Sequence, residues 1–349
     1  MRTSYKKEDV TILLKDITGM IDPLPTSERE KLIQSGMHYC QMLPLEYVPS
    51  KEYMEAYNQA LLAFSKSVAD ATAIVSDKII KLKGNNVVLV SLARAGIPIG
   101  ILIKHYIFWK YKIDVPHYSV SIIRGKGIDK NAINYILKRH QACQIQFVDG
   151  WIGKGAISAE LKNALADYKN ISPDLAVLSD PANITFLCGT HEDILIPSSC
   201  LNSTVSGLIS RTVLRDDLIA EDDFHGAVYY ENLKDSDLSY SFINAIEKEF
   251  SLIAKDTFTM ADGSARDEVV TIADHFKISD INLIKPGIGE ATRVLLRRVP
   301  WKILVDKKYM TSSHLSHLLK LAKEKNVLVE KYPLKHYKCC GIIRNLADS

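Results

Sequence analysis

One stretch near the middle of the chain, QIQFVDGWIGKGAIS at residues 144–158, constrains the fold most. Its apolar residues up to Val148 are typical of the end of a buried strand, and Asp149 closes that run. The glycines that follow predict a tight loop, and a helical pattern starts near Ala156. Such a loop can hold an anion, because free backbone N–H groups and the positive end of the helix dipole face the same point. An ordinary strand-to-helix turn with a surface lysine explains the stretch equally well.

The residues before this stretch alternate between strand and helix patterns. We expect strands at 87–92, 118–123 and 145–148, and helices at 97–109 and 130–140. Ser50 caps a long amphipathic helix that precedes them. Strands that alternate with helices predict an α/β fold with a parallel sheet, which binds its ligands at the carboxyl ends of the strands.

Three loops lie at that edge of the expected sheet. The loop at 91–100, SLARAGIPIG, places Arg94 among small residues that let a ligand approach, although tight packing explains these residues as well. The loop at 124–129, RGKGID, is typical of a mobile cover over an anion or of a plain surface turn. With Lys154 in the third loop, they favour a ligand that carries two separated anionic groups on a ribose.

The composition indicates a globular protein of two or three domains, since the chain has 349 residues. The longest apolar run, at 97–109, is interrupted by Lys104 and His105, and the N-terminus lacks the apolar core of a signal peptide. We therefore expect no membrane span and a cytoplasmic location. The six cysteines lack the paired spacing of a zinc site and are expected to be reduced.

The net charge of +3 is unevenly distributed. From residue 281 onward, 14 Lys and Arg stand against 5 Asp and Glu, a net charge of +9, so the preceding residues carry −6. A basic module favours nucleic acid as a partner, although a solvated basic face is commoner. We expect a boundary near residues 262–264, with one domain at residues 1–262 and a βαβαβ domain at residues 265–349.

The motifs SLARAGIPIG and FVDGWIGKGAI, and the segment at 186–214, resemble the StiP family of phosphoribosyltransferase-like proteins found with tellurite-resistance and stress-response genes. The resemblance implies a type I phosphoribosyltransferase-like parallel-sheet domain. It also implies a Mg²⁺-dependent transferase that moves the phosphoribosyl group of phosphoribosyl diphosphate to a base or base-like acceptor in a stress response.

The resemblance further implies the residues of the site. The catalytic residues would be Asp149, Arg94, Arg124 and Lys126, and Asp149 would also bind the metal. The phosphates would be held by Gly153, Lys154, Gly155, Ala156, Ile157, Ser158, Ala93, Ala95 and Gly96. The polar central segment would bind the acceptor through His191, Glu192, Asp193, Asn202, Ser203 and Arg211. Helix capping and local hydrogen bonds are the alternative there, with a helix expected from Asn202 or Ser203 through Val213.

The last 70 residues or so resemble the Pelota-type RNA-binding domain. The loop KPGIGEATR at 285–293 presents backbone N–H groups and charged side chains at a helix start, which suits RNA phosphates and base edges. The expected RNA contacts are Lys285, Gly287, Gly289, Glu290, Arg293, Arg297 and Arg298. A module for domain docking or for a homodimer is the alternative.

Two other functions stay open. Gly150 stands where ordinary transferases carry a second acid, which favours a non-catalytic sensor of nucleotides or phosphoribosyl diphosphate that binds RNA. The other function is a cysteine protease, in which Cys200 precedes a predicted helix start that would lower its pKa, and His191 is near in sequence. A buried structural cysteine is the simpler explanation, since no thiol-protease signature surrounds Cys200.

Overall fold

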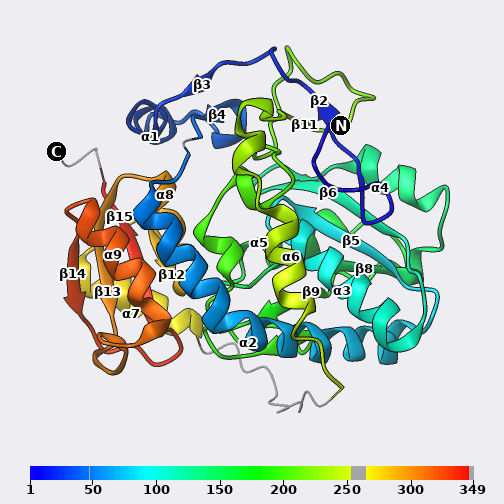
Figure 1. Cartoon of the computed structure of the whole chain (residues 1–349). Helices are drawn as coiled ribbons and strands as arrows, with labels where there is room; N and C mark the ends of the chain where they lie inside the picture. The colour runs from blue at the N-terminus through cyan, green and yellow to red at the C-terminus, as the bar shows by residue number, and fades with distance from the viewer. Residues whose placement is uncertain (47, 253–264, 346–349) are drawn as a thin grey trace.

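The computed structural model describes residues 1–46, 48–252 and 265–345. Figure 1 shows a large α/β domain beside a smaller one that contains the C-terminus. The large domain has a sheet with the order β1-β6-β5-β8-β9-β10, in which all neighbours are parallel, and β7 pairs antiparallel with β6. Its strands are β1 Thr11–Ile12, β5 Val88–Ala93, β6 His117–Ile123, β7 Gly127–Ile128, β8 Ile145–Val148, β9 Leu175–Ser179 and β10 Cys188–Thr190. The predicted α/β class with a parallel sheet is confirmed.

Helices cover both faces of this sheet. Side chains alternate along β5, so that Leu89 joins one core cluster while Val88 and Val90 join the other. The first cluster lies under α2, α3 and α6, and the second lies under α4 and α5. These helices are α2 Lys51–Lys83, α3 Gly96–Tyr111, α4 Lys130–Leu137, α5 Ala156–Ala164 and α6 Ser239–Glu247. The side chain of Ser50 accepts a hydrogen bond from the backbone N–H of Tyr53 and caps α2, as predicted.

Short strands tie the N-terminal segment to the large domain. β2 (Lys15–Asp16) pairs with β11 (Gly226–Ala227), and β3 (Pro23–Leu24) pairs with β4 (Leu43–Pro44). Between β3 and β4 lies α1 (Thr26–Gln34). These pairings hold α1 near the carboxyl ends of the sheet strands, where it contributes to the site described below.

The smaller domain has its own mixed sheet with the order β12-β15-β13-β14. β15 is antiparallel to both of its neighbours, whereas β13 and β14 are parallel. Its elements are α7 Ala265–Phe276, β12 Ile284–Pro286, α8 Ile288–Arg297, β13 Pro300–Val305, α9 Ser316–Glu324, β14 Leu328–Lys331 and β15 Cys339–Ile343. The expected βαβαβ order is present, and β15 is an additional strand that the sequence analysis missed.

The two domains are docked through buried contacts. α2 packs on α3 and α6 of the large domain and on α9 of the small one (Figure 1). The carboxylate of Asp193 accepts hydrogen bonds from the backbone N–H groups of Ile288 and Lys338, each at 2.9 Å. A Cβ on Gly289 would lie 2.7 Å from the ring of Trp151, so this glycine allows α8 to approach the large domain closely. The start of α8 therefore faces the ends of the sheet strands.

The helix expected from Asn202 or Ser203 through Val213 is wrong. Only Ser203–Val205 forms a 3₁₀ turn, and the φ angles of +74° at Gly207 and +57° at Leu208 end it. Farther on, residues 209 and 213 form isolated β-bridges. The boundary expected at 262–264 lies outside the described residues. Within the described ranges, no helix has the length and apolar character to cross a membrane.

Candidate functional site

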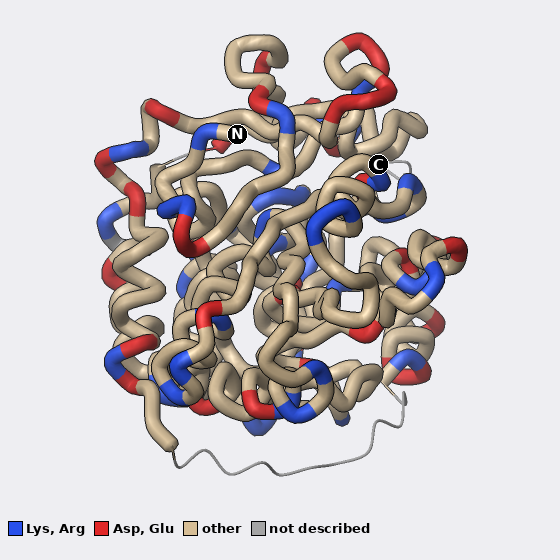
Figure 2. Tube along the Cα trace, turned by 90° about the vertical axis from the view of Figure 1, so that its right-hand side faces the viewer, with Lys and Arg blue, Asp and Glu red and all other residues tan. Residues whose placement is uncertain are grey.

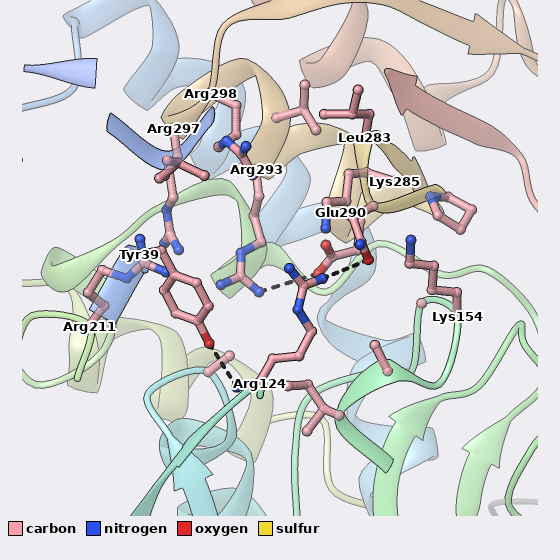
Figure 3. A pocket seen from close by; sticks show the side chains of 18 of the residues that line it. Tyr39, Arg124, Lys154, Arg211, Leu283, Lys285, Glu290, Arg293, Arg297 and Arg298 are labelled. Atoms are coloured by element: carbon pink, nitrogen blue, oxygen red, sulfur yellow. Dashed lines mark hydrogen bonds and ion pairs between the residues drawn. The ribbon is translucent and has the colours of Figure 1, made fainter. Parts of the chain in front are cut away.

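A cavity of about 580 Å³ lies at the carboxyl ends of the parallel strands, between the two domains (Figure 3). Ala95 after β5, Arg124 after β6 and Asp149 after β8 line it on one side. The other walls come from α1, β12 and α8. Parallel α/β sheets bind their ligands at this edge, and the volume is in the range of small-molecule sites.

Most of the residues predicted to hold phosphates line this cavity. Residues 153–158 and Ala95 are on its wall, whereas Ala93 and Gly96 are not. A Cβ on Gly96 would lie 2.6 Å from the carbonyl oxygen of Val148, so this glycine serves the close packing of α3 on β8. The assignment of all these residues to phosphate binding stays a prediction.

The loop before α5 is shaped by Gly155, whose φ of +83° is a left-handed conformation that favours glycine. Lys154 precedes it, and its Nζ donates hydrogen bonds to the carbonyl oxygens of Ile281, at 2.6 Å, and Ile284, at 3.2 Å. Burial lowers the pKa of Lys154 to about 8, and the nearby charges of Lys285 and Arg124 add to this effect. Lys154 thus links the loop of the large domain to the small domain.

Asp149 lies at the cavity wall directly after β8, as predicted. Its Oδ1 accepts a hydrogen bond from the N–H of Gly150 at 2.8 Å. Burial raises the pKa of Asp149 to about 7, although the Gly150 N–H and the charge of Arg293 oppose the shift. The carboxyl is therefore close to half-protonated at neutral pH. A Mg²⁺ ion at Asp149 stays a prediction.

Asp149→Asn is expected to stabilise the protein at pH 8 by about 2 kcal/mol. An acid whose pKa is raised by folding contributes stability below pH 4 that is lost as pH rises through 7. The full shift from 3.8 to about 7 corresponds to roughly 4 kcal/mol, of which we count half because the carboxyl lines an open cavity. Asparagine keeps the acceptor for Gly150. Urea unfolding at pH 4 and pH 8 measures the difference, and equal stabilities at pH 8 contradict it.

Arg94 lines the cavity but is held by contacts within the large domain. Its guanidinium donates hydrogen bonds to the carbonyl oxygen of Ile209 at 2.6 Å and to the carboxylate of Glu46 at 2.7 Å. The side chains of this ion pair are 6% and 4% exposed. Burial raises the pKa of Glu46, but the charges of Arg94 and Arg297 more than offset this and hold it below its ordinary value. Sequence reasoning missed Glu46, because it is a lone acid outside any motif.

The basic loop after β6 is anchored rather than free at its glycines. The N–H groups of Gly125 and Gly127 donate to the carboxylate of Glu160 on α5, at 2.7 and 2.9 Å. Arg124 lines the cavity and donates through Nη1 to Asn282 of the small domain at 2.9 Å. Lys126 is exposed and lies outside the cavity wall. The proposed mobile cover and the catalytic roles of Arg124 and Lys126 stay predictions.

The six residues predicted to bind an acceptor do not form one cluster. Only Arg211 lines the large cavity. Asp193 holds the small domain, Asn202 accepts a hydrogen bond from Arg297, and Ser203 donates to Glu46 at 3.0 Å. His191 and Glu192 lie in the turn after β10, away from the cavity wall. Their common role as an acceptor site stays a prediction.

The charged residues expected to bind RNA also face the large domain. Lys285, Glu290, Arg293, Arg297 and Arg298 all line the cavity, as Figure 3 shows. The neighbouring glycines pack as well, Gly287 beside Asp193 and Gly289 on Trp151. On the side of the large domain that is turned away from the small domain, Lys and Arg are interspersed among Asp and Glu (Figure 2). The sequence indicated the charge of the small domain's face but not the direction in which it points.

The cysteine proposed as a nucleophile, Cys200, does not have the environment of one. It is 0% exposed, and burial raises its pKa to about 12. Its carbonyl oxygen accepts a hydrogen bond from the hydroxyl of Tyr53 at 2.9 Å, inside the core. The expected lowered pKa is wrong, because Cys200 does not precede a helix start but lies in a buried 3₁₀ turn.

His191 lies instead beside another cysteine, Cys188 on β10. The Sγ of Cys188 is 3.5 Å from Nε2 of His191, and Nδ1 of His191 is 3.0 Å from the carbonyl oxygen of Asp180. The carboxylate of Asp180 is 3.6 Å from the same Nδ1. It is fixed by the N–H groups of Ile184 and Thr185, and burial raises its pKa. The sequence analysis named His191 but missed its two neighbours. Cys188 stands only three residues before His191, whereas Asp180 comes near it through the connection between β9 and β10.

A second pair of this kind occurs at Cys40, whose Sγ is 2.9 Å from Nδ1 of His38. That imidazole nitrogen also accepts the backbone N–H of Cys40 at 3.3 Å, as the cap of a 3₁₀ turn. Burial raises the pKa of Cys40, and the other nitrogen of His38 meets the carbonyl oxygen of Arg124 rather than a carboxylate. Capping accounts for this pair.

The ligand atoms of Cys188, His191 and Asp180 lie within 4.8 Å of one another, and such a set of ligands can also bind Zn²⁺.

The fold places the chain in the class of two-domain proteins that join a parallel-sheet α/β domain to a smaller domain with a mixed sheet. Residues 263–345 match the PELOTA RNA binding domain, and residues 3–247 match the family described as tellurite-like stress resistance cysteine protease StiP. A relative from Acinetobacter baylyi, named cysteine protease StiP, is 39% identical over 341 residues, which cover 92% of this chain and 88% of the relative. The chain belongs to the StiP family.

The predicted transferase is therefore wrong. The family and the relative are both named cysteine proteases, in agreement with the third of our hypotheses and not with a Mg²⁺-dependent phosphoribosyltransferase. A phosphoribosyltransferase from Helicobacter pylori is 17% identical with a TM-score of 0.24, over 31% of this chain and 68% of that one. One from Bacillus anthracis is also 17% identical, with a TM-score of 0.25, over 34% and 68%. Likenesses this weak carry no argument about function.

Proposed function

We propose that this protein is a thiol hydrolase that cleaves peptide bonds, and that Cys188 is its nucleophile. The observation that carries the proposal is the cluster of these three residues: the Cys188 thiol lies 3.5 Å from Nε2 and 3.8 Å from Nδ1 of His191, and the carboxylate of Asp180 lies 3.6 Å from Nδ1. A nucleophile, a base and a group that orients the base are the parts that thiol and serine hydrolases share. The names of the family and of the relative support the same class.

The contacts of His191 select the tautomer that this chemistry needs. Nδ1 donates its proton to the carbonyl oxygen of Asp180 at 3.0 Å, which leaves Nε2 unprotonated at 3.5 Å from the thiol. Nε2 takes the proton of Cys188 as the sulfur bonds to the carbonyl carbon of the substrate. The same proton then passes to the leaving amine as the peptide bond breaks, and water releases the acyl group from the sulfur. The nearby carboxylate of Asp180 stabilises the imidazolium that forms in between.

The thiol is 1% exposed, so substrate reaches it only when the turn after β10 opens. Iodoacetamide tests this directly in a Cys143→Ser background, because Cys143 is exposed and would react first. We expect hydrolysis of labelled casein to fall in proportion to the alkylation of Cys188, as followed by peptide mass spectrometry. Full activity after complete alkylation of Cys188, or no hydrolysis before treatment, contradicts the proposal. Zinc found in stoichiometric amount by metal analysis would instead assign the three residues to a metal site.

A further inference from the structure

The cavity between the domains carries far more positive than negative charge. Among the described residues that line it, nine are Lys or Arg and four are Asp or Glu. Five of the cations come from the large domain with its N-terminal segment, and four come from the small domain. Two of the acids already form ion pairs: Glu30 with Arg298 at 2.6 Å, and Glu290 with Arg293 at 3.4 Å. The cavity therefore holds more cations than the acids that line it can neutralise.

Arg29 and Arg211 make no ion pair within the described part of the chain. Arg29 is 3% exposed, and its Nε is buried without a hydrogen-bond acceptor. The guanidinium of Arg211 lies 4.5 Å from the centroid of the Tyr39 ring. Burial, together with the charges of Arg29, Arg293 and Arg94 and against the effect of Tyr39, lowers the pKa of Arg211 to about 9. Buried donors without acceptors lower the free energy of unfolding. Groups in such an unfavourable environment are typical of ligand-binding sites.

The shape of the site limits what can enter it. Lys285, Arg293 and Arg297 of the small domain point into the cavity, toward Arg124 and Arg211 of the large domain (Figure 3). A cavity of about 580 Å³ accommodates a small molecule but not an RNA helix, so a helix does not enter it while the domains are docked. A compact ligand does, and one with separated anionic groups can meet cations of both domains at once.

We propose that the docked domains form one binding site for a compact polyanion with at least two phosphate groups, and that the basic face of the small domain serves this site rather than an extended RNA surface. Cys188, His191 and Asp180 do not line the cavity, so this site is separate from the proposed hydrolase site. The proposal does not depend on the hydrolase function. The phosphates meet Arg211 and Arg29 from one side and Lys285 and Arg293 from the other. The ligand thereby holds the two domains together.

Calorimetry on the whole chain with inorganic pyrophosphate tests this proposal. We expect binding that weakens at high salt, and an affinity about tenfold lower or worse in both Arg211→Met and Lys285→Met, one variant from each domain. Each substitution also removes a cation from a repelling group. We therefore expect the midpoint of urea unfolding without ligand to stay equal or to rise, whereas a purely structural role would lower it.

Arg266→Met is the matched control, because Arg266 is an exposed arginine of α7 outside the cavity. It is expected to bind pyrophosphate like the unaltered protein. Absence of pyrophosphate binding at low salt would overturn the proposal. So would tight binding of a hairpin RNA that is lost in Lys285→Met and that saturating pyrophosphate does not displace, since the face would then serve RNA. Displacement of the RNA by pyrophosphate would support the compact site.

Discussion

Cys188→Ala is expected to abolish the hydrolysis of labelled casein by the whole protein. A methyl group cannot form the covalent bond to the acyl carbon, so the rate should fall by at least about a thousandfold. The side chain is small and buried between β9 and the second core cluster, so its loss should cost only about 1 kcal/mol of stability. Hydrolysis rates, with circular dichroism to show that the variant is folded, measure both effects.

Cys40→Ala is the matched control for this experiment. Cys40 is also buried and also lies beside a histidine, His38, but its imidazole caps a turn and faces no carboxylate on its other side. Full activity in Cys40→Ala together with loss in Cys188→Ala assigns the nucleophile. Loss of activity in Cys40→Ala with full activity in Cys188→Ala would identify Cys40 as the nucleophile and contradict our assignment. His191→Gln should retain the fold, lose most of the activity and slow the alkylation of Cys188.

The regular part of the large domain could be predicted because burial imposes a period on the sequence. β5 is buried on both faces, and the sequence shows it as a continuous apolar run. α3 is apolar all round, and its length rather than its period distinguished it from a strand. Both elements lie within two residues of the expected bounds, which were 87–92 and 97–109. β15 was missed, since CCGII gives no strong pattern outside the sheet that it completes.

The segment at 186–214 shows where such patterns fail. Its apolar residues, such as Val205 and Ile209, are almost wholly buried, which made a helix plausible after Asn202. The burial comes instead from packing against the N-terminal residues and α6. A Cβ on Gly207 would lie 2.5 Å from Thr3 Oγ1 and from the ring of Tyr5. Contacts with residues some 200 positions away decide the conformation here, and no local pattern encodes them.

The residues of the candidate sites likewise divide into those that a local sequence pattern predicts and those that only the folded chain brings together. The glycine loop and Asp149 were found because they are contiguous in sequence, and a strand followed by a helix fixes where such a loop lies. Asp180 was missed, since it meets His191 only where β10 joins the edge of the sheet. Cys188, three residues before His191, lay within reach of a local pattern and was nevertheless not singled out. The charge of α8 was found, but its orientation depends on Asp193, which no local rule connects with the small domain.

Glu46→Gln is expected to lower the free energy of unfolding by about 3–5 kcal/mol. The carboxylate and its partner Arg94 are almost fully buried, and Ser203 also donates to it at 3.0 Å. The substitution leaves the buried charge of Arg94 unpaired among the other cations of the cavity. The free-energy cost of this unpaired charge exceeds what the remaining hydrogen bonds of Arg94 contribute. Urea unfolding of the whole chain measures the change.

The double variant Glu46→Gln/Arg94→Met separates an unpaired charge from a loss of packing. If the unpaired guanidinium is the cause, removing it should restore most of the stability, because two uncharged side chains of similar volume replace a buried ion pair at little net cost. Arg215→Met is the control for charge alone, since Arg215 pairs with Asp217 on the surface and such a pair contributes less than about 1 kcal/mol. A double variant as unstable as Glu46→Gln would instead show that Glu46 acts through Ser203 and the turn that follows it.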